Sequence, residues 1–112
     1  MRLQLIGPMT NMGPDFNYPA FHAAATMLRE QGHEIFNPAE SGGGDTTLPR
    51  AYYMRASIGG LLAAEGVVLL KDWESSAGAK TELRVALALG LPVMSLDSKG
   101  PPAWAMREEP DD

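Results

Sequence analysis

Residues 66–92 constrain the fold of this chain more than any other part of the sequence. They open with a short apolar run, Val67–Leu70, which is too short for an isolated helix and is typical of a buried strand. A polar turn follows, and from about Ala77 apolar residues recur at helical spacing as far as a helix stop at Gly90. A second apolar run, Val93–Leu96, comes next. The order strand, loop, helix, strand is the unit of a parallel sheet.

The rest of the chain repeats this alternation. Leu3–Ile6 and Glu34–Phe36 are predicted strands, and a helix is predicted from about Pro19, because proline suits a first helical turn. The apolar residues of that helix share one face: Phe21, Ala24, Ala25 and Leu28. A second helix is predicted over Arg50–Ala64, where Gly59-Gly60 weakens the helix but would permit close packing. Between them, residues 39–49 form a long loop with a glycine triplet, and loops of this length are usually functional or mobile.

The element order predicts an α/β fold. With right-handed crossovers, β-α-β-α-β-α-β gives a small three-layer sandwich around a parallel sheet of four or five strands, of the flavodoxin-like type. The expected strand order is 2-1-3-4, in which strands 1 and 3 are neighbours and their connections leave in opposite directions. Such a sheet has a crevice at the carboxyl ends of these strands, where open α/β sheets bind ligands. The loops Gly7–Tyr18 and Asp72–Gly78 would then face each other across this crevice.

Length and charge indicate one domain and limit the classes of partner. We expect residues 1–98 to form a single α/β domain and residues 99–112 an acidic, mobile tail, since Arg107–Asp112 has one arginine and four acids. The net charge is −5 and there is no basic stripe, which argues against a nucleic acid polymer as partner. No apolar run approaches the roughly 18 residues of a membrane span, and no signal peptide is evident. The absence of cysteine fits a cytoplasmic protein.

Several residues of the second loop and of the following helix are candidates for chemistry, and each has a plainer interpretation. Glu82 lies on the rim of the apolar face of its helix, either as a solvated surface glutamate or as a carboxylate leaning into the crevice. Asp72 follows the end of a predicted strand, and it would either form the turn there or contact a bound ligand. Ser75 and Ser76 suit helix caps, although a phosphate competes for the same backbone N–H groups; Gly78 allows close backbone approach.

The first loop offers a second group of candidates. Gly7 and Pro8 form either a simple turn or a point where backbone approaches a sugar or phosphate, and Met9 follows them toward the crevice. The loop ends in a mixed aromatic and polar cluster that would stack a base or cap the helix: Asp15, Phe16, Asn17 and Tyr18.

Cations and histidines give weaker signals. Four cations would meet a phosphate or remain solvated: Arg50, Arg55, Lys71 and Lys80. His22 and His33 do not have the spacing of a metal site, and no phosphate-loop, dinucleotide or serine-hydrolase motif occurs. We therefore predict no metal and no cofactor.

The chain resembles a small domain family of unknown function, frequent in phage and bacterial genomes, over four segments: LIGPMT…PDFNYPAF, GHEIFNPAE, LPRAYYMR and VVLLKDWESSAGAKTELRVALALGLPV. That family is in turn similar to the nucleoside 2-deoxyribosyltransferase superfamily, which includes the deoxynucleoside 5′-monophosphate N-glycosidases. The second likeness depends on the Gly-Pro after strand 1, the Asp after strand 3, and an S-x-G-x-x-x-E helix entry.

This resemblance implies roles for individual residues. Glu82 would be the nucleophile and Asp72 would hold or protonate the base. Ser76 and Gly78 would bind sugar or phosphate, and Gly7 with Pro8 would line the pocket floor. The superfamily's C-terminal asparagine, which a neighbouring subunit donates, has no obvious counterpart in residues 99–112.

The function expected from this resemblance is that of a deoxyribosyltransferase-like enzyme that cleaves or transfers an N-glycosidic bond through a glutamate nucleophile. Its partner would be a small-molecule nucleoside or nucleotide. The alternatives are a non-catalytic nucleotide-binding module, for example one encoded by a phage, and a structural α/β domain with a vestigial crevice. We also expect a homodimer or higher homo-oligomer, because a chain of 12.0 kDa has little wall for a closed pocket.

Overall fold

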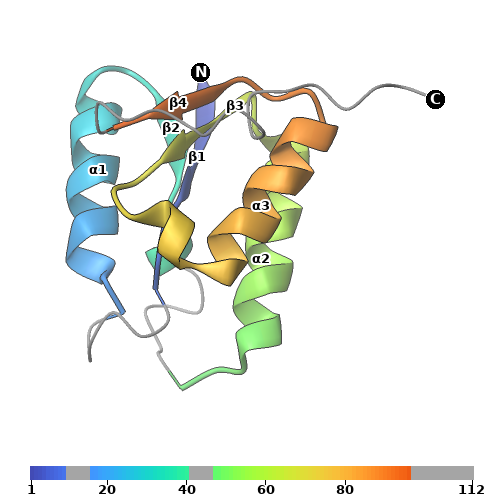
Figure 1. Ribbon diagram of the computed structural model, residues 1–112. Helices are drawn as coiled ribbons and strands as arrows, with labels where there is room; N and C mark the ends of the chain where they lie inside the picture. Colours follow the sequence, from blue (N-terminus) through green and yellow to red (C-terminus); the bar gives the residue numbers. More distant parts are fainter. Residues whose placement is uncertain (10–15, 41–46, 97–112) are drawn as a thin grey trace.

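A computed structural model describes residues 1–9, 16–40 and 47–96 of the chain (Figure 1). The main elements, in chain order, are β1 (Arg2–Ile6), α1 (Tyr18–Glu30), β2 (Glu34–Phe36), α2 (Arg50–Ala63), β3 (Gly66–Leu69), the 3-10 helix η2 (Trp73–Ser75), α3 (Ala77–Ala88) and β4 (Val93–Ser95). The boundaries of the predicted strands and helices agree with these to within one residue or so, and the predicted C-terminal tail lies outside the described residues.

The four strands form one parallel sheet in the order β2-β1-β3-β4, which confirms the predicted topology. In the centre of the sheet, β1 and β3 pair with Leu5 opposite Val68 and Ile6 opposite Leu69. Both central strands are almost wholly buried, as expected for parallel strands covered on both faces. The switch point between β1 and β3 therefore lies at the carboxyl ends of the two central strands of the sheet.

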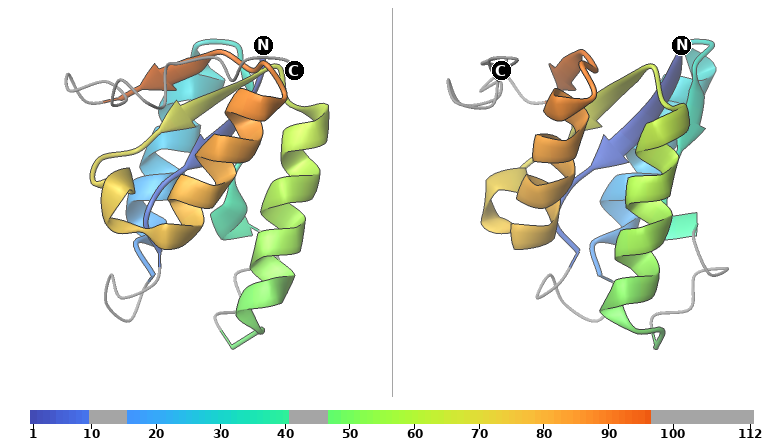
Figure 2. Two further views of the ribbon diagram at one scale, coloured as in Figure 1. Left: turned by 45° about the vertical axis from the view of Figure 1, so that its right-hand side comes forward. Right: turned by 90° about the vertical axis from the view of Figure 1, so that its right-hand side faces the viewer.

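Helices cover both faces of the sheet, and Figure 2 shows α1 on one side and α2 with α3 on the other. Successive residues of β1 point to opposite faces, as the strand period requires. Leu3 and Leu5 pack in the core cluster that contains the α1 residues Phe21 and Leu28. Ile6 packs with Leu61, Leu83 and other residues of the α2 and α3 side. This is the predicted three-layer sandwich.

Local signals explain where the helices begin and end. The predicted apolar face of α1 is the face that is buried. Gly32 and Gly90, just beyond α1 and α3, have φ angles of +94° and +75°, which glycine adopts without strain. At the start of α3, Ser76 Oγ accepts the N–H of Ala79 at 3.1 Å.

Trp73 departs from the sequence prediction. Residues 72–76 were predicted as a polar turn, whereas Trp73 within them is 1% exposed and packs with Leu69 and Leu83. The 3-10 helix places the indole of Trp73 against Leu69 at the end of β3. This anchors the connection between β3 and α3.

No helix in the described part of the chain combines the length and the apolar character that crossing a membrane requires.

Candidate functional site

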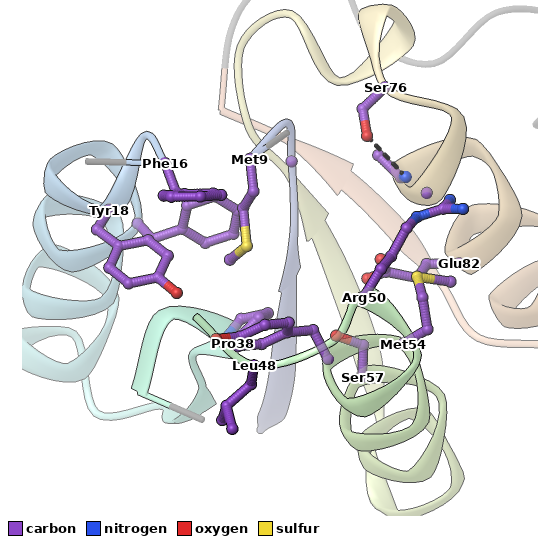
Figure 3. Close-up of a pocket in the computed structure, with 15 residues that line it drawn as sticks. Met9, Phe16, Tyr18, Pro38, Leu48, Arg50, Met54, Ser57, Ser76 and Glu82 are labelled. Atoms are coloured by element: carbon purple, nitrogen blue, oxygen red, sulfur yellow. Dashed lines mark hydrogen bonds between the residues drawn. The ribbon is translucent and has the colours of Figure 1, made fainter. Parts of the chain in front are cut away.

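A cavity of about 240 Å³ lies at the carboxyl ends of β1 and β3, the switch point of the sheet (Figure 3). One side of its wall is apolar and aromatic and comes from the segments after β1 and β2, together with α1. The residues on that side are Met9, Phe16, Tyr18, Phe21, Pro38 and Leu48. The other side comes from α2 and the start of α3 and is more polar. It contains Arg50, Tyr53, Met54, Ser57, Ser76, Gly78, Ala79 and Glu82.

Gly7 forms the part of the wall that follows β1 directly. A Cβ atom on this residue would lie 2.9 Å from Cβ of Leu70, a distance that real Cβ atoms essentially never show. The ends of β1 and β3 therefore approach each other closely only because residue 7 is glycine.

The first turn of α3 faces α2 across the polar side of the cavity. A Cβ atom on Gly78 would lie 3.5 Å from Met54 Sδ and 3.7 Å from Arg50 Nη2. Gly78 thus brings the N-terminus of α3 close to the first turn of α2. Because the first N–H groups of a helix lack intrahelical acceptors, this end of α3 is electropositive.

Glu82 is buried in the cavity wall and is only 8% exposed. Among the described residues, no hydrogen bond or ion pair to its carboxyl is present, and burial raises its pKa to about 8. The interpretation of Glu82 as a solvated surface glutamate is therefore wrong. Its rim position is covered because α2 packs beside α3, which the periodicity of α3 alone does not reveal.

The cavity brings together six of the ten candidates from the sequence: Gly7, Met9, Tyr18, Ser76, Gly78 and Glu82. Its wall does not include Pro8, Asp72 or Ser75, and Asp15 lies outside the described residues.

Asp72 serves as a turn residue in this structure. It is exposed, its φ of +64° is left-handed, and its carbonyl accepts the N–H and Oγ of Ser75 at 3.0 and 2.7 Å. Asparagine and aspartate tolerate this backbone region better than other side-chain-bearing residues. A catalytic part for Asp72 remains a prediction, and the cavity wall gives it no support.

The α2 side of the site was largely missed from sequence. Arg50 was only one of four candidate cations, and Tyr53, Met54 and Ser57 were not site candidates. These four residues have the spacing i, i+3, i+4, i+7 of a single helix face, so the pattern was present. The spacing alone did not predict that this helix face points toward the crevice. Within the described residues, no group of three or more acidic, histidine or cysteine side chains is placed to hold a metal ion.

Comparisons with known proteins agree with this architecture. A protein-family model described as "Domain of unknown function (DUF4406)" matches residues 1–95. Among solved structures, a 2-deoxyribosyltransferase from Bacillus psychrosaccharolyticus has a TM-score of 0.71 and 19% sequence identity, over 94% of this chain and 80% of that chain. No curated protein matches the sequence. At this identity the structural likeness establishes the fold and not the activity.

Proposed function

The chain belongs to this domain family of unknown function and has a deoxyribosyltransferase-like fold. From the residues of its cavity, we propose that it cleaves or transfers the N-glycosidic bond of a deoxynucleoside or deoxynucleotide. The observation that carries the proposal is the buried, unpaired carboxyl of Glu82 in the cavity wall at the switch point of the sheet. Glu82 would be the nucleophile.

The burial of the Glu82 carboxyl supports a role for this residue in function rather than in folding. Burying an ionisable group without a partner destabilises the folded state, which a purely structural position has no cause to accept. Residues with strongly shifted pKa values in clefts are candidates for active sites. Glu82 satisfies both conditions, since its pKa is raised to about 8 and its side chain lines a cavity.

The proposed reaction has two steps. The Glu82 carboxylate attacks C1′ of the deoxyribosyl group, the C1′–N bond breaks, and the base departs with the bonding electron pair and takes up a proton from water. This leaves a glycosyl ester on Glu82. Water or a nitrogen of a second base then attacks C1′ and loses a proton to solvent, while the C1′–O bond to Glu82 breaks. This releases the sugar product and regenerates the carboxylate. The lack of a 2′-hydroxyl makes the positively charged transition state easier to reach.

The two sides of the cavity suit the two parts of such a substrate. The side formed by Met9, Phe16 and Tyr18 is apolar and aromatic and would hold a base by stacking and burial. The sugar would then lie beside Glu82, over the glycine backbone at position 7.

The direct test is release of free base, followed by chromatography, from a panel of deoxynucleosides and their 5′-monophosphates. We expect Glu82→Gln to lower the rate at least a thousandfold, which is about 4 kcal/mol of barrier. The exposed Glu74 is the matched control, and Glu74→Gln should keep the wild-type rate. Equal rates for wild type and Glu82→Gln would remove Glu82 from the mechanism.

A second candidate function is binding of a nucleotide without catalysis. The observation that favours it is that Glu82 is the only carboxyl among the described residues of the wall, so no second acid is placed there to protonate a leaving base. Clear ligand binding with no base release from any substrate would support this candidate.

A further inference from the structure

Gln4 is a polar residue in the middle of β1, between buried apolar residues. It is 0% exposed, and its neighbours Leu3, Leu5 and Ile6 belong to the hydrophobic core. Its Nε2 donates to the carbonyl of Ser57 in α2 at 2.7 Å, whereas Oε1 has no hydrogen-bond partner among the described residues. Burying an amide with one unpaired atom destabilises the folded state, so stability alone does not explain a glutamine at this position.

The amide of Gln4 holds α2 closer to β1 than an apolar side chain of the same length could. An N–H group approaches an oxygen atom to about 2.9 Å, whereas a methyl group packs at roughly 3.5–4.0 Å from its neighbours. Oε1 meets α2 at a second point, because a Cβ on Gly60 would collide with it. Ser57 and Gly60 are three residues apart, so the two contacts fix one turn of α2 against the strand.

The turn of α2 that is held in this way forms part of the cavity wall. Ser57 and Met54 line the cavity together with Glu82, and Met54 Sδ lies 3.5 Å from the position of a Cβ on Gly78. Gly78 and Glu82 are four residues apart and share one face of α3. The face of α2 that Gln4 fixes is therefore the one that packs over Glu82. Figure 3 shows Met54 and Ser57 on the side of the cavity that also carries Glu82.

We propose that Gln4 is a positioning residue for this cavity. By holding α2 against β1 at Ser57 and Gly60, it determines how completely α2 covers the carboxyl of Glu82. The consequence for catalysis rests on the proposed function, whereas the position of α2 on the sheet does not.

The ionisation of Glu82 reports the position of α2. Burial is the cause of its raised pKa of about 8. The other ionisable side chains of the described wall are Tyr18 of α1 and, on α2, Arg50 and Tyr53. A displaced α2 would admit water to the carboxyl of Glu82 and lower its pKa.

Titration of the Glu82 carboxyl, followed by carbon-13 NMR and assigned with Glu82→Gln, tests this proposal without a ligand. Wild type should titrate near pH 8. Gln4→Met replaces the amide by an apolar side chain of similar length, and Gly60→Ala displaces α2 at the second contact. Both should lower the midpoint by at least one pH unit. Leu5→Met is the matched control, since Leu5 is equally buried but packs on the α1 side of β1, and it should titrate as wild type does.

The pH profile of base release gives a second measurement. Its rising limb should move to lower pH in Gln4→Met by the same interval as the NMR midpoint. The urea midpoint of Gln4→Met should stay at or above that of wild type, because the unpaired buried atom is removed together with the hydrogen bond. A merely structural role would instead lower the urea midpoint and the rate at every pH.

Three results would overturn the proposal: a wild-type midpoint near the value of about 4.3 for a solvated glutamate, a midpoint that either Gln4→Met or Gly60→Ala leaves unchanged, or an equal shift in Leu5→Met. Its failure is distinguishable from that of the proposed function. A shifted titration without base release from any substrate would retain Gln4 as the positioning residue and contradict the chemistry assigned to Glu82. Base release that depends on Glu82, with an unchanged titration in Gln4→Met, would retain the nucleophile and overturn the role of Gln4.

Discussion

Glu82 is the residue at which stability and proposed activity are in conflict. Its carboxyl is 8% exposed, and burial raises its pKa to about 8. In the unfolded chain a glutamate titrates near 4.3. Between these two pKa values the folded protein holds a proton that the unfolded chain has lost. The contribution of Glu82 to the free energy of unfolding is therefore largest below about pH 4.3. As the pH rises from there toward 8, this contribution falls by up to about 1.4 kcal/mol per pH unit.

Replacing Glu82 by glutamine should remove this dependence, because the amide stays neutral at every pH. We expect Glu82→Gln to be more stable than wild type at pH 8 by a few kcal/mol, with the difference shrinking steadily toward pH 5. Urea denaturation at several pH values measures it, and the exposed Glu74→Gln variant should run parallel to wild type. Parallel curves for wild type and Glu82→Gln would show that the carboxyl is ionised or solvated in the folded state.

The same carboxyl sets the expected pH dependence of catalysis. A nucleophile must be ionised, and with a pKa of about 8 only roughly a tenth of Glu82 is ionised at pH 7. The kcat/KM for base release should therefore rise tenfold per pH unit below 8 and level off above it. Initial rates between pH 6 and 9 test this. A rate that falls over this range would indicate that the protonated form of Glu82 is the active one.

At the scale of elements, the position of α2 on the sheet depends on one of two adjacent glycines. Gly60 packs against the buried Gln4 of β1, and a Cβ there would collide with Gln4 Oε1 and lie 3.3 Å from Phe36 Cδ1. Gln4 Nε2 also donates to the carbonyl of Ser57 at 2.7 Å. Gly59 has nothing within 4 Å of its Cβ position. This contact holds the helix that supplies Arg50 to the cavity.

Alanine should consequently have opposite effects at the two positions. Gly59→Ala should stabilise the protein by roughly 0.5–1 kcal/mol, because alanine is the better helix former. Gly60→Ala has the same propensity gain but overpacks the interface, so a net loss of about 1–2 kcal/mol is expected. Chemical denaturation of the two variants gives both values. A stabilised Gly60→Ala variant would show that α2 can shift away from β1 at no cost.

At the scale of the whole molecule, a chain of 12.0 kDa leaves large apolar side chains on its surface. Tyr52 and Leu62 of α2 are 45% and 73% exposed, and Leu89, Met94 and Leu96 near β4 are exposed as well. Large apolar patches on a protein surface commonly mark interfaces between proteins. A homodimer or higher homo-oligomer would cover it.

Light scattering after size exclusion should therefore give a mass of at least twice 12.0 kDa at micromolar concentration. Leu62→Glu should shift the mass toward that of one chain, because a charged side chain would have to be desolvated in the interface. Gly59→Ala, on the same exposed side of α2 but without a charge, serves as the control. A monomer mass for the wild type would contradict the expected oligomer.

Sequence alone determined the order of the elements, the parallel sheet, its strand order and the place of the crevice. These properties follow from local periodicity, from glycine and proline punctuation, and from the general handedness of crossovers, all of which are present in the chain before it folds. The helix entry that carries Ser76, Gly78 and Glu82 was recognised for the same reason, because its residues are neighbours on one helix.

Only the tertiary structure decided which side chains share the cavity. Glu82 is buried because α2 packs over the rim of α3, and Arg50 meets Gly78 because two helices distant in sequence approach each other there. Asp72 has a left-handed backbone and is absent from the cavity wall, and Trp73, in the 3-10 helix that follows, is buried in the core. Burial and proximity between elements depend on distances across the folded chain, and periodicity within one element contains no information about them.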